Sequence, residues 1–327
     1  MSLSSHLDDP GSPIRAFLRE RFPHVPSWVR REASEARRTF AAKGGVLLLP
    51  ASPPPGQTIP FGTLGTAFDY RLRFEFEVAQ RAYVAQAGLR ALVRMRVLTR
   101  ETVEALWQQL DELLHRTQPW AKVLEEEDEA RLGRLCVAMT WGEQLVRCGM
   151  VPPILEERPK NLAQLLALVP TFWLDDLAGL VRLWREGSRD ALPSGAILNP
   201  TFDGSAWIGG ADADLIVDGC LLEIKTSTKT GWSSEWIRQL LGYVLLDLSD
   251  QHGIESVGLY LARQGLLLRW PLPELLWELA GEPVDLETWR GDFAGVVMSV
   301  ALPFEPLRRS YPGESVSTRK ISWPSPD

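Results

Sequence analysis

The clearest local structural signal in the chain lies in residues 209–225. They read Gly209-Gly210-Ala211-Asp212-Ala213-Asp214-Leu215-Ile216-Val217-Asp218-Gly219-Cys220-Leu221-Leu222-Glu223-Ile224-Lys225. Two apolar runs flank the Asp218-Gly219 pair, which is a strong signal for a two-residue β-hairpin turn. With that pair at the centre of the turn, residues 215–217 pair antiparallel with residues 220–222. The sequence therefore predicts a tight hairpin with a defined register.

The same register brings four charged residues to the open end of the hairpin. Asp214 falls opposite Glu223, and Asp212 falls opposite Lys225. Directly paired residues share a face and side chains alternate along a strand, so all four are expected on one side. Two or three carboxylates beside one ammonium can hold a divalent cation and activate a water. The alternative is a salt-bridged surface ladder. Asp212 remains open as a further ligand, a partner of the lysine or a solvated charge.

The segment after the hairpin predicts a helix over residues 234–248. Its apolar positions follow the i, i+3, i+4, i+7 spacing of a single buried stripe: Ile237, Leu240, Leu241, Val244, Leu245 and Leu248. Gln239 and Tyr243 are helical neighbours four positions apart, and we expect them to project roughly opposite that stripe. Trp236 lies beside them. A glutamine, a tyrosine and a tryptophan away from the core face suit a ligand groove.

The remaining chain contains helical periodicity first and short strands later. Helices are predicted near residues 15–22, 28–40, 63–90, 101–116, 122–148 and 161–186, with Pro170 dividing the last. From Leu198 onward short β-like runs dominate, and we expect strands over 207–217, 221–226, 257–263 and 266–270. A short helix near 275–279 follows, and residues 310–327 have the composition of a loose tail.

These residues match the pattern of a known family. Asp214 followed by Glu223-Ile224-Lys225 resembles the Asp…(Asp/Glu)-x-Lys signature of the PD-(D/E)XK nuclease superfamily. Downstream, Gln239-Leu240-Leu241-Gly242-Tyr243 resembles the Gln-x-x-x-Tyr motif of its RecB-like branch. Upstream, Gly65-Thr66-Ala67-Phe68-Asp69 is similar to that branch's first helical motif, in which a histidine or glutamate is usual. Asp69 is a departure from that pattern.

The resemblance implies an α/β protein with a restriction-endonuclease-like core, in which a mixed sheet is flanked by helices, and a large helical insertion. The implied divisions are an N-terminal segment (1–60), the first core helix with the insertion (61–195), the nuclease core (196–282) and a C-terminal extension with a loose tail (283–327). The insertion, roughly 95–190, would form a wall or lid over nucleic acid.

The resemblance also implies roles for individual residues. Asp214, Glu223 and the backbone carbonyl of Ile224 would bind Mg²⁺ or Mn²⁺, and Lys225 would be the catalytic lysine. Gln239 and Tyr243 would line the site. The function implied is metal-dependent hydrolysis of DNA phosphodiester bonds.

Other side chains near the motif are candidates for contact with DNA. Trp236 could stack on bases, and three basic residues are available for phosphates: Lys229, Arg238 and Arg263. The formal net charge of −7 argues against a broadly basic nucleic-acid coat but leaves room for a local basic groove.

Composition restricts the remaining possibilities. Three scattered cysteines suggest neither a disulfide framework nor a zinc site, and they are too few for the iron–sulfur cluster of some RecB-like proteins. No apolar run reaches membrane-spanning length and the first residues lack a secretory pattern, so we expect a cytoplasmic protein without membrane contact.

Two rival functions remain open beside an autonomous deoxyribonuclease. One is a catalytically inactive module that binds nucleic acid or protein within a bacterial defence or repair complex. The other is a nuclease that is active only with protein partners in such a multi-component system. The acidic balance and the large insertion favour protein contacts.

Overall fold

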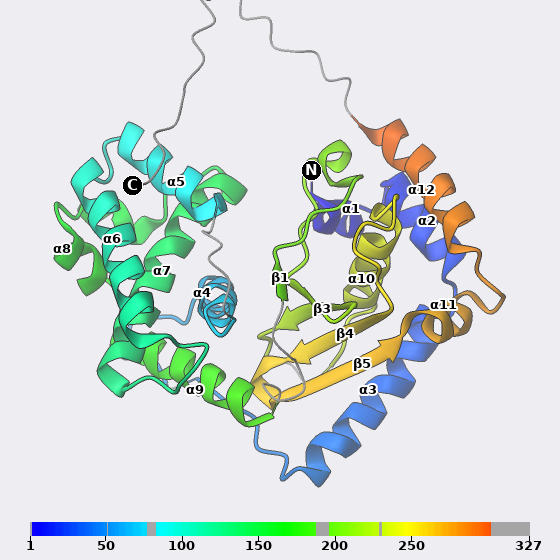
Figure 1. Cartoon of the computed structure of the whole chain (residues 1–327), viewed down its shortest axis with the longest axis horizontal. Coiled ribbons are helices and arrows are strands. Elements are labelled where there is room, and N and C mark those ends of the chain that lie inside the picture. The colour runs from blue at the N-terminus through cyan, green and yellow to red at the C-terminus, as the bar shows by residue number, and fades with distance from the viewer. Residues whose placement is uncertain (1, 51, 77–82, 188–195, 229–230, 302–327) are drawn as a thin grey trace, which may run out of the picture.

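The computed structural model describes residues 2–50, 52–76, 83–187, 196–228 and 231–301. They form two lobes, one entirely helical and one built on a β-sheet (Figure 1). The helical lobe contains α4 (Phe61–Arg73), α5 (Tyr83–Arg94), α6 (Arg100–Thr117), α7 (Glu126–Cys148), the 3₁₀ turn η1 (Pro153–Glu157), α8 (Leu162–Ala167) and α9 (Thr171–Gly187).

The other lobe is organised around five strands. These are β1 (Ala196–Leu198), β2 (Leu215–Val217), β3 (Cys220–Lys225), β4 (Ser256–Leu261) and β5 (Leu266–Pro271), and they lie in that order across the sheet. β3 and β4 are parallel, whereas the other neighbours are antiparallel. The protein is therefore an α/β structure with a mixed sheet.

The hairpin between β2 and β3 forms in the expected register. Val217 pairs with Cys220 and Leu215 pairs with Leu222. Asp218 and Gly219 both have positive φ angles, +46° and +66°, as a type I′ turn requires. The turn residues therefore fix which strand residues face which side of the sheet.

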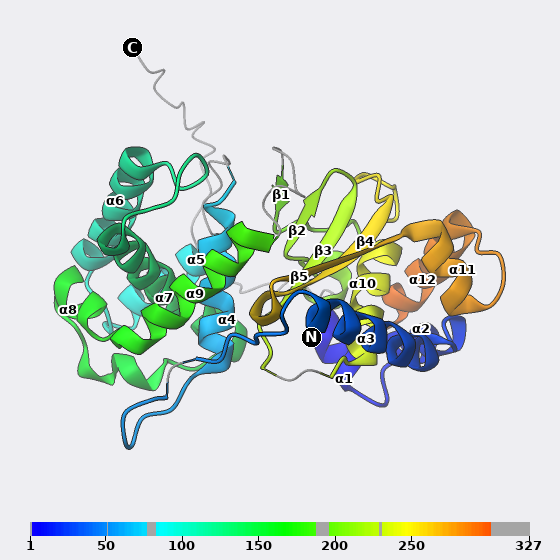
Figure 2. The same cartoon turned by 90° about the horizontal axis from the view of Figure 1, so that it is seen from below.

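Helices cover the two faces of the sheet, and each face belongs to a separate apolar core. Ile216 and Leu221 pack with the sheet-lobe helices, whereas Leu215, Val217 and Leu222 pack with the helical lobe. The sheet-lobe helices are α1 (Leu3–Asp8), α2 (Pro13–Arg21), α3 (Val25–Ala42), α10 (Ser234–Leu246), α11 (Leu272–Ala280) and α12 (Leu286–Val300), seen to one side of the sheet in Figure 2.

The two lobes meet through close and buried contacts. A Cβ atom on Gly65 of α4 would lie 2.7 Å from the hydroxyl of Thr226, which follows β3 directly. Arg263 lies in the 3₁₀ turn η4 (Ala262–Gln264) after β4 and forms a buried two-pronged ion pair with Asp176 of α9, at 2.7 Å for both bonds. The first contact places α4 against the end of the strand that carries the charged motif, and the second fixes α9 against the turn after β4.

Several element boundaries differ from the sequence prediction. The long helix predicted over 63–90 is wrong in extent, because α4 ends at Arg73 and α5 begins at Tyr83. The strand predicted over 207–217 is shorter, since Ser205–Ile208 form the 3₁₀ turn η3 and β2 begins at Leu215. The division at Pro170 is confirmed.

The C-terminal extension contains a helix that the sequence does not predict. Helix α12 has Gly291 and Gly295 in its interior, which lower helix propensity. It forms because Phe293 and Val297 are buried in the core of the sheet lobe. The expected loose tail lies outside the described residues. No helix in the part of the chain that the structure describes is long and apolar enough to cross a membrane.

Candidate functional site

The hairpin opens where the charged residues begin. The backbone pairing of β2 with β3 ends at Leu215 and Leu222. The residues just before β2 pair instead with the residues that follow β1. Asn199 N–H donates to the Asp214 carbonyl at 3.1 Å, and Thr201 forms a β-bridge with Asp212. Asp214 keeps contact with β3 through its side chain, since Oδ2 accepts the Ile224 N–H at 2.6 Å. The Asp214 carboxylate thus replaces a backbone carbonyl as the acceptor for β3 where backbone pairing ends.

The expected pairing of Asp212 with Lys225 is not formed. The Asp212 carboxylate instead accepts a hydrogen bond from Arg147 of α7 at 2.9 Å. Arg147 also pairs with Glu143 one turn earlier on the same helix. Asp212 therefore joins the sheet lobe to the helical lobe, and its carboxylate has a cationic partner other than the lysine.

Lys225 is held between two partners on different elements. Its Nζ donates to Glu223 Oε1 at 2.7 Å and to Gln239 Oε1 at 3.1 Å. Gln239 Nε2 donates to the Tyr243 hydroxyl at 2.7 Å, and that hydroxyl donates to the Asp212 carbonyl at 2.9 Å. The motif residues of β3 and α10 thus form one continuous hydrogen-bonded chain.

The expected placement of Tyr243 away from the core is wrong in part. Its ring is buried and stacks on Phe202, with 5.3 Å between ring centroids. Only the hydroxyl reaches the polar network. Gln239 is half-buried and does face the site, as the helix periodicity predicts.

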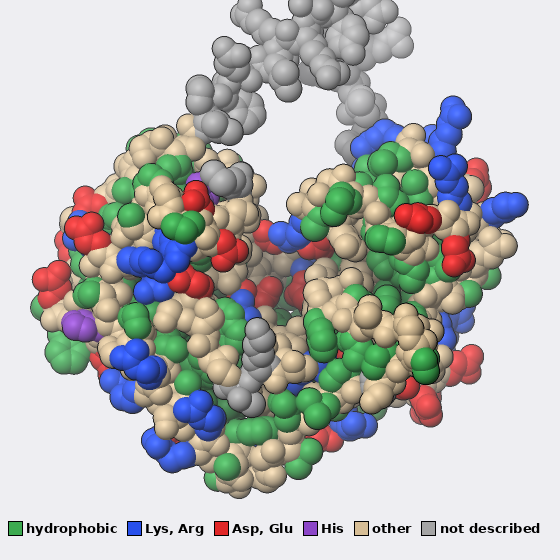
Figure 3. Space-filling view, turned by 180° about the vertical axis from the view of Figure 1, so that it is seen from behind, with side chains coloured by type: hydrophobic (Ala, Val, Ile, Leu, Met, Phe, Trp, Pro, Cys, Tyr) green, Lys and Arg blue, Asp and Glu red, His purple; other side chains and the backbone are tan. Residues whose placement is uncertain are grey.

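A pocket of about 300 Å³ gathers the acidic side chains from three parts of the chain. Asp69 and Glu143 line it from α4 and α7, together with the three acids of the hairpin region, Asp212, Asp214 and Glu223. Asp69 lies within this acidic pocket, where it pairs with Arg73. Figure 3 shows acidic and basic side chains along the floor of the hollow between the lobes.

The sequence does not reveal Glu143, Arg147 or Arg73 as part of this pocket. The only local signal is the i, i+4 spacing of Glu143 and Arg147 within an apolar helix, which is a common arrangement on any helix surface. Their position depends on how α7 and α4 pack, which is a property of the tertiary fold.

The acidic pocket disfavours the charged forms of its carboxyl groups. Burial, and then the neighbouring charges of Glu223 and Asp69, raise the pKa of Asp214 well above its ordinary value. Burial also raises the pKa of Glu223, although the ion pair with Lys225 opposes this. Asp69 behaves similarly, with a burial-raised pKa that Arg73 opposes. The cations Arg73 and Lys225 therefore offset the burial of these carboxyl groups only in part.

A bound divalent cation would compensate the negative charge of these buried carboxylates. Glu223 is 5 % exposed, and its Oε2 atom is buried without a hydrogen-bond partner. An unpaired carboxylate oxygen in such a place is costly unless a ligand meets it. Within the described ranges, no group of three or more His, Cys, Asp or Glu side chains is arranged to hold a metal. A site for Mg²⁺ needs only one or two carboxylates, since this ion keeps several waters.

The side chains expected to contact DNA are only partly available. Trp236 is half-buried, and Lys225 Nζ lies 5.8 Å from its ring centroid. Arg238 is buried against Glu235, and Arg263 is buried in its pair with Asp176, so neither can reach a phosphate. Their burial corrects the prediction. Lys229 lies outside the described residues.

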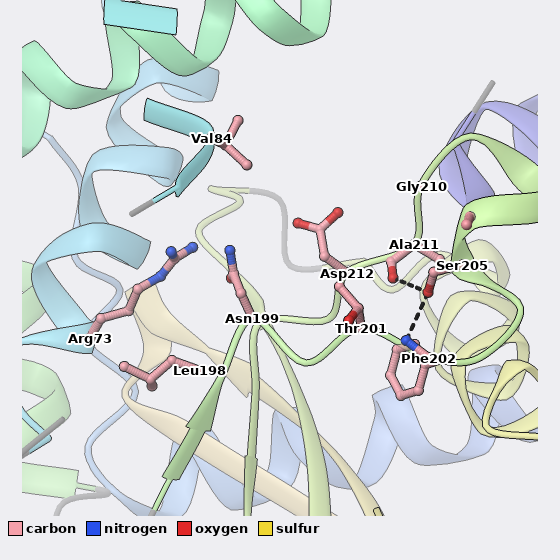
Figure 4. Close-up of a pocket in the computed structure, with 11 residues that line it drawn as sticks. Arg73, Val84, Leu198, Asn199, Thr201, Phe202, Ser205, Gly210, Ala211 and Asp212 are labelled. Atoms are coloured by element: carbon pink, nitrogen blue, oxygen red, sulfur yellow. Dashed lines mark hydrogen bonds between the residues drawn. The ribbon is translucent and has the colours of Figure 1, made fainter. Parts of the chain in front are cut away.

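A larger cavity of about 610 Å³ adjoins the acidic pocket. The two share Arg73, Asn199 and Asp212 as lining residues. In Figure 4, Val84 of α5 lies above Arg73 and Asn199, and Asp212 lies to their right. The volume lies within the range of small-ligand pockets.

Comparison with protein-family models, curated proteins and solved structures finds no match to this chain. Roles for these residues are therefore argued from their geometry and from the motif resemblance.

Proposed function

We propose that this chain is a Mg²⁺- or Mn²⁺-dependent nuclease that hydrolyses DNA phosphodiester bonds on a restriction-endonuclease-like core of the RecB-like type. The observation that carries the proposal is the unpaired, buried Glu223 Oε2 in the same pocket as Asp214, with Lys225 bonded to the other oxygen of Glu223. The mixed sheet, with the motif on its central strand and α10 packed beside it, supports the proposed core.

Each residue of the site has a distinct part in the proposed reaction. Asp214, Glu223 and the Ile224 carbonyl would hold the metal, and Asp69 extends the acidic wall. The bound cation would supply Lewis-acid stabilisation of the phosphate. The Lys225 ammonium donates hydrogen bonds that orient the attacking water and stabilise negative charge on the phosphate. Gln239, fixed by Tyr243, restricts where that ammonium can lie.

The direct test is DNA cleavage by the purified chain. Circular and linear DNA incubated with Mg²⁺ or Mn²⁺ should be cut. Lys225→Ala should abolish cleavage, while Lys43→Ala, an exposed lysine at the end of α3, should retain it. Cleavage that survives Lys225→Ala unchanged would refute the assignment. The two substrates also separate endonuclease from exonuclease activity, since only an endonuclease cuts the circle.

A second candidate is a catalytically inactive binding module. It is favoured by the ion pairs that Asp69 and Asp212 form with arginines, which leave fewer carboxylates free for a metal. Calorimetry with Mn²⁺ discriminates between the two. The nuclease should bind Mn²⁺ and lose that binding in Asp214→Asn, whereas the inactive module should bind DNA or a partner without metal. Mn²⁺ binding without cleavage by the isolated chain would point to a nuclease that needs protein partners.

A further inference from the structure

A second polar pocket lies on the helical lobe, apart from the acidic pocket. It has a volume of about 400 Å³ and is formed by α5 and α6. Three arginines and one glutamate line it, and the full set is Gln86, Arg90, Val93, Arg94, Arg100, Val103, Glu104 and Trp107. We refer to it as the arginine pocket. In a chain with a net charge of −7, this local excess of positive charge requires an explanation.

The three arginines are exposed, and none of them forms an ion pair with another described residue. Arg90, Arg94 and Arg100 form no ion pair with any residue that the structure describes, in contrast to Arg71, Arg73 and Arg147 of the same lobe. Arg90 and Arg94 lie four positions apart on α5, where like charges repel. Arg100 begins α6, where the helix dipole disfavours a cation. An anionic ligand would relieve each of these unfavourable interactions.

The arginine pocket also contains an aromatic donor without an acceptor. Trp107 lines the pocket from α6, and its indole Nε1 is buried with no hydrogen-bond partner among the described atoms. Aromatic and arginine side chains together are the combination with which proteins bind single-stranded nucleic acid. The half-buried Trp107 ring therefore adds an aromatic surface beside the three arginines.

Helix α5 connects the arginine pocket to the candidate active site. Val84, in its first turn, lines the 610 Å³ cavity that adjoins the acidic pocket. Gln86, Arg90 and Arg94 follow at four-residue intervals on one face, each about 6 Å further along the helix axis. Val84 and Arg94 are thus separated by about 15 Å along α5. Because residues two positions apart face different sides of a helix, a strand with its scissile phosphate at the acidic pocket would run along α5 and also cross it to reach the arginines.

We propose that the arginine pocket binds phosphates of the substrate strand at a distance from the bond that is cut. The identity of the ligand as nucleic acid rests on the proposed nuclease function. The helical lobe then contributes affinity and orientation, whereas the hairpin contributes the chemistry. The substrate is accordingly a strand that extends well past the scissile bond.

The test is the salt dependence of binding to a labelled single-stranded oligonucleotide, with Ca²⁺ in place of Mg²⁺. The test protein carries Arg90→Gln, Arg94→Gln and Arg100→Gln. The control carries Arg30→Gln, Arg37→Gln and Arg158→Gln, which are exposed and cause the same change in net charge. We expect the test protein to lose tenfold or more in affinity. Its slope of log affinity against log salt should decrease by about 2, since each phosphate contact on a single strand contributes about 0.7. The control protein should keep an affinity and a salt slope close to those of the parent protein.

Three outcomes decide the proposal. Equal losses in the test and control proteins would overturn it, because only net charge would then matter. Displacement of the labelled strand by a mononucleotide at similar concentration would also overturn it, because the site would then be a nucleotide pocket. A selective loss in the test protein supports it. If the intact protein neither binds Mn²⁺ nor cuts DNA and the selective loss is still seen, the nuclease proposal fails and the arginine pocket stands.

Discussion

Asp214 Oδ2 lies 2.6 Å from the backbone nitrogen of Ile224, across the point where β2 and β3 stop pairing. Backbone pairing between β2 and β3 has ended at this point. This single side-chain bond therefore holds Asp214 beside the strand that carries Glu223. The two acids are thereby kept close in a pocket that raises the pKa of each. This arrangement should destabilise the metal-free protein, and the proposed cation would offset that cost.

The destabilisation caused by burying Asp214 should appear in the pH dependence of the free energy of unfolding. A carboxyl group whose pKa is raised in the folded state lowers the free energy of unfolding of the protein as pH rises. The decrease begins near the unfolded pKa, about 4, and is complete above the folded pKa. Asp214→Asn removes that penalty and keeps an oxygen for the Ile224 N–H. The metal-free variant should melt at least about 2 °C above the parent protein at pH 8 and should show no such gain at pH 4.

The matched control for this prediction is Asp218→Asn. Asp218 is exposed in the hairpin turn, and asparagine tolerates its positive φ angle. Its melting temperature should follow that of the parent at both pH values in a thermal unfolding experiment. A loss of stability in Asp214→Asn at pH 8 would show that the carboxylate is needed for the fold and is not a strained ligand.

Gln239 should act as a positioning residue for Lys225. Removing its side chain in Gln239→Ala leaves the ammonium with Glu223 as its one remaining partner in the bonded chain. Loss of position in a catalytic group costs rate more than binding, so kcat should fall by about tenfold to a hundredfold while the Mn²⁺ affinity stays the same. Gln108→Ala, on the exposed face of α6, provides the control and should leave kcat unchanged. A parallel loss of Mn²⁺ affinity would assign Gln239 to the integrity of the pocket instead.

The parts of the fold that local sequence encodes were predictable. The hairpin register follows from two turn residues, and the apolar stripe of α10 follows from helical spacing. The break between α4 and α5 was not predictable, because apolar and polar residues continue in a helical pattern through that region. Helix α12 was missed for the opposite reason, since its glycines weaken a helix that tertiary packing of Phe293 then stabilises.

The site itself was predictable only where its residues are close in sequence. Glu223, Lys225 and Gln239 come together as the strand and helix patterns predict. Arg147 and Asp212 are 65 positions apart, and no local pattern indicates that they pair. Arg263 illustrates the same limit. The sequence places it at the end of a predicted strand and available for phosphates, whereas Asp176 of α9 buries it.

The pairing of Arg147 with Asp212 should weaken metal binding. The guanidinium adds positive charge beside the pocket and occupies the Asp212 carboxylate at 2.9 Å. Its side chain is 47 % exposed, so the effect is screened by solvent. Arg147→Gln should tighten Mn²⁺ binding by about twofold to fivefold, which corresponds to the interaction free energy of an exposed ion pair. Calorimetric titration measures this, with Arg158→Gln as a control of equal charge. An unchanged affinity would place Asp212 outside the reach of the ion.

The Arg263–Asp176 pair should link the stability of the two lobes to the geometry of the site. Either Arg263→Met or Asp176→Leu leaves one charge buried alone, and each should lower the free energy of unfolding by about 3–5 kcal/mol. The double variant should recover most of this loss in urea unfolding, because no unpaired charge remains. Arg263 also donates to the carbonyl of Thr226 at 2.8 Å, directly after Lys225. The double variant should therefore regain stability without regaining full kcat. Additive losses from the two single changes would show instead that the residues are not coupled.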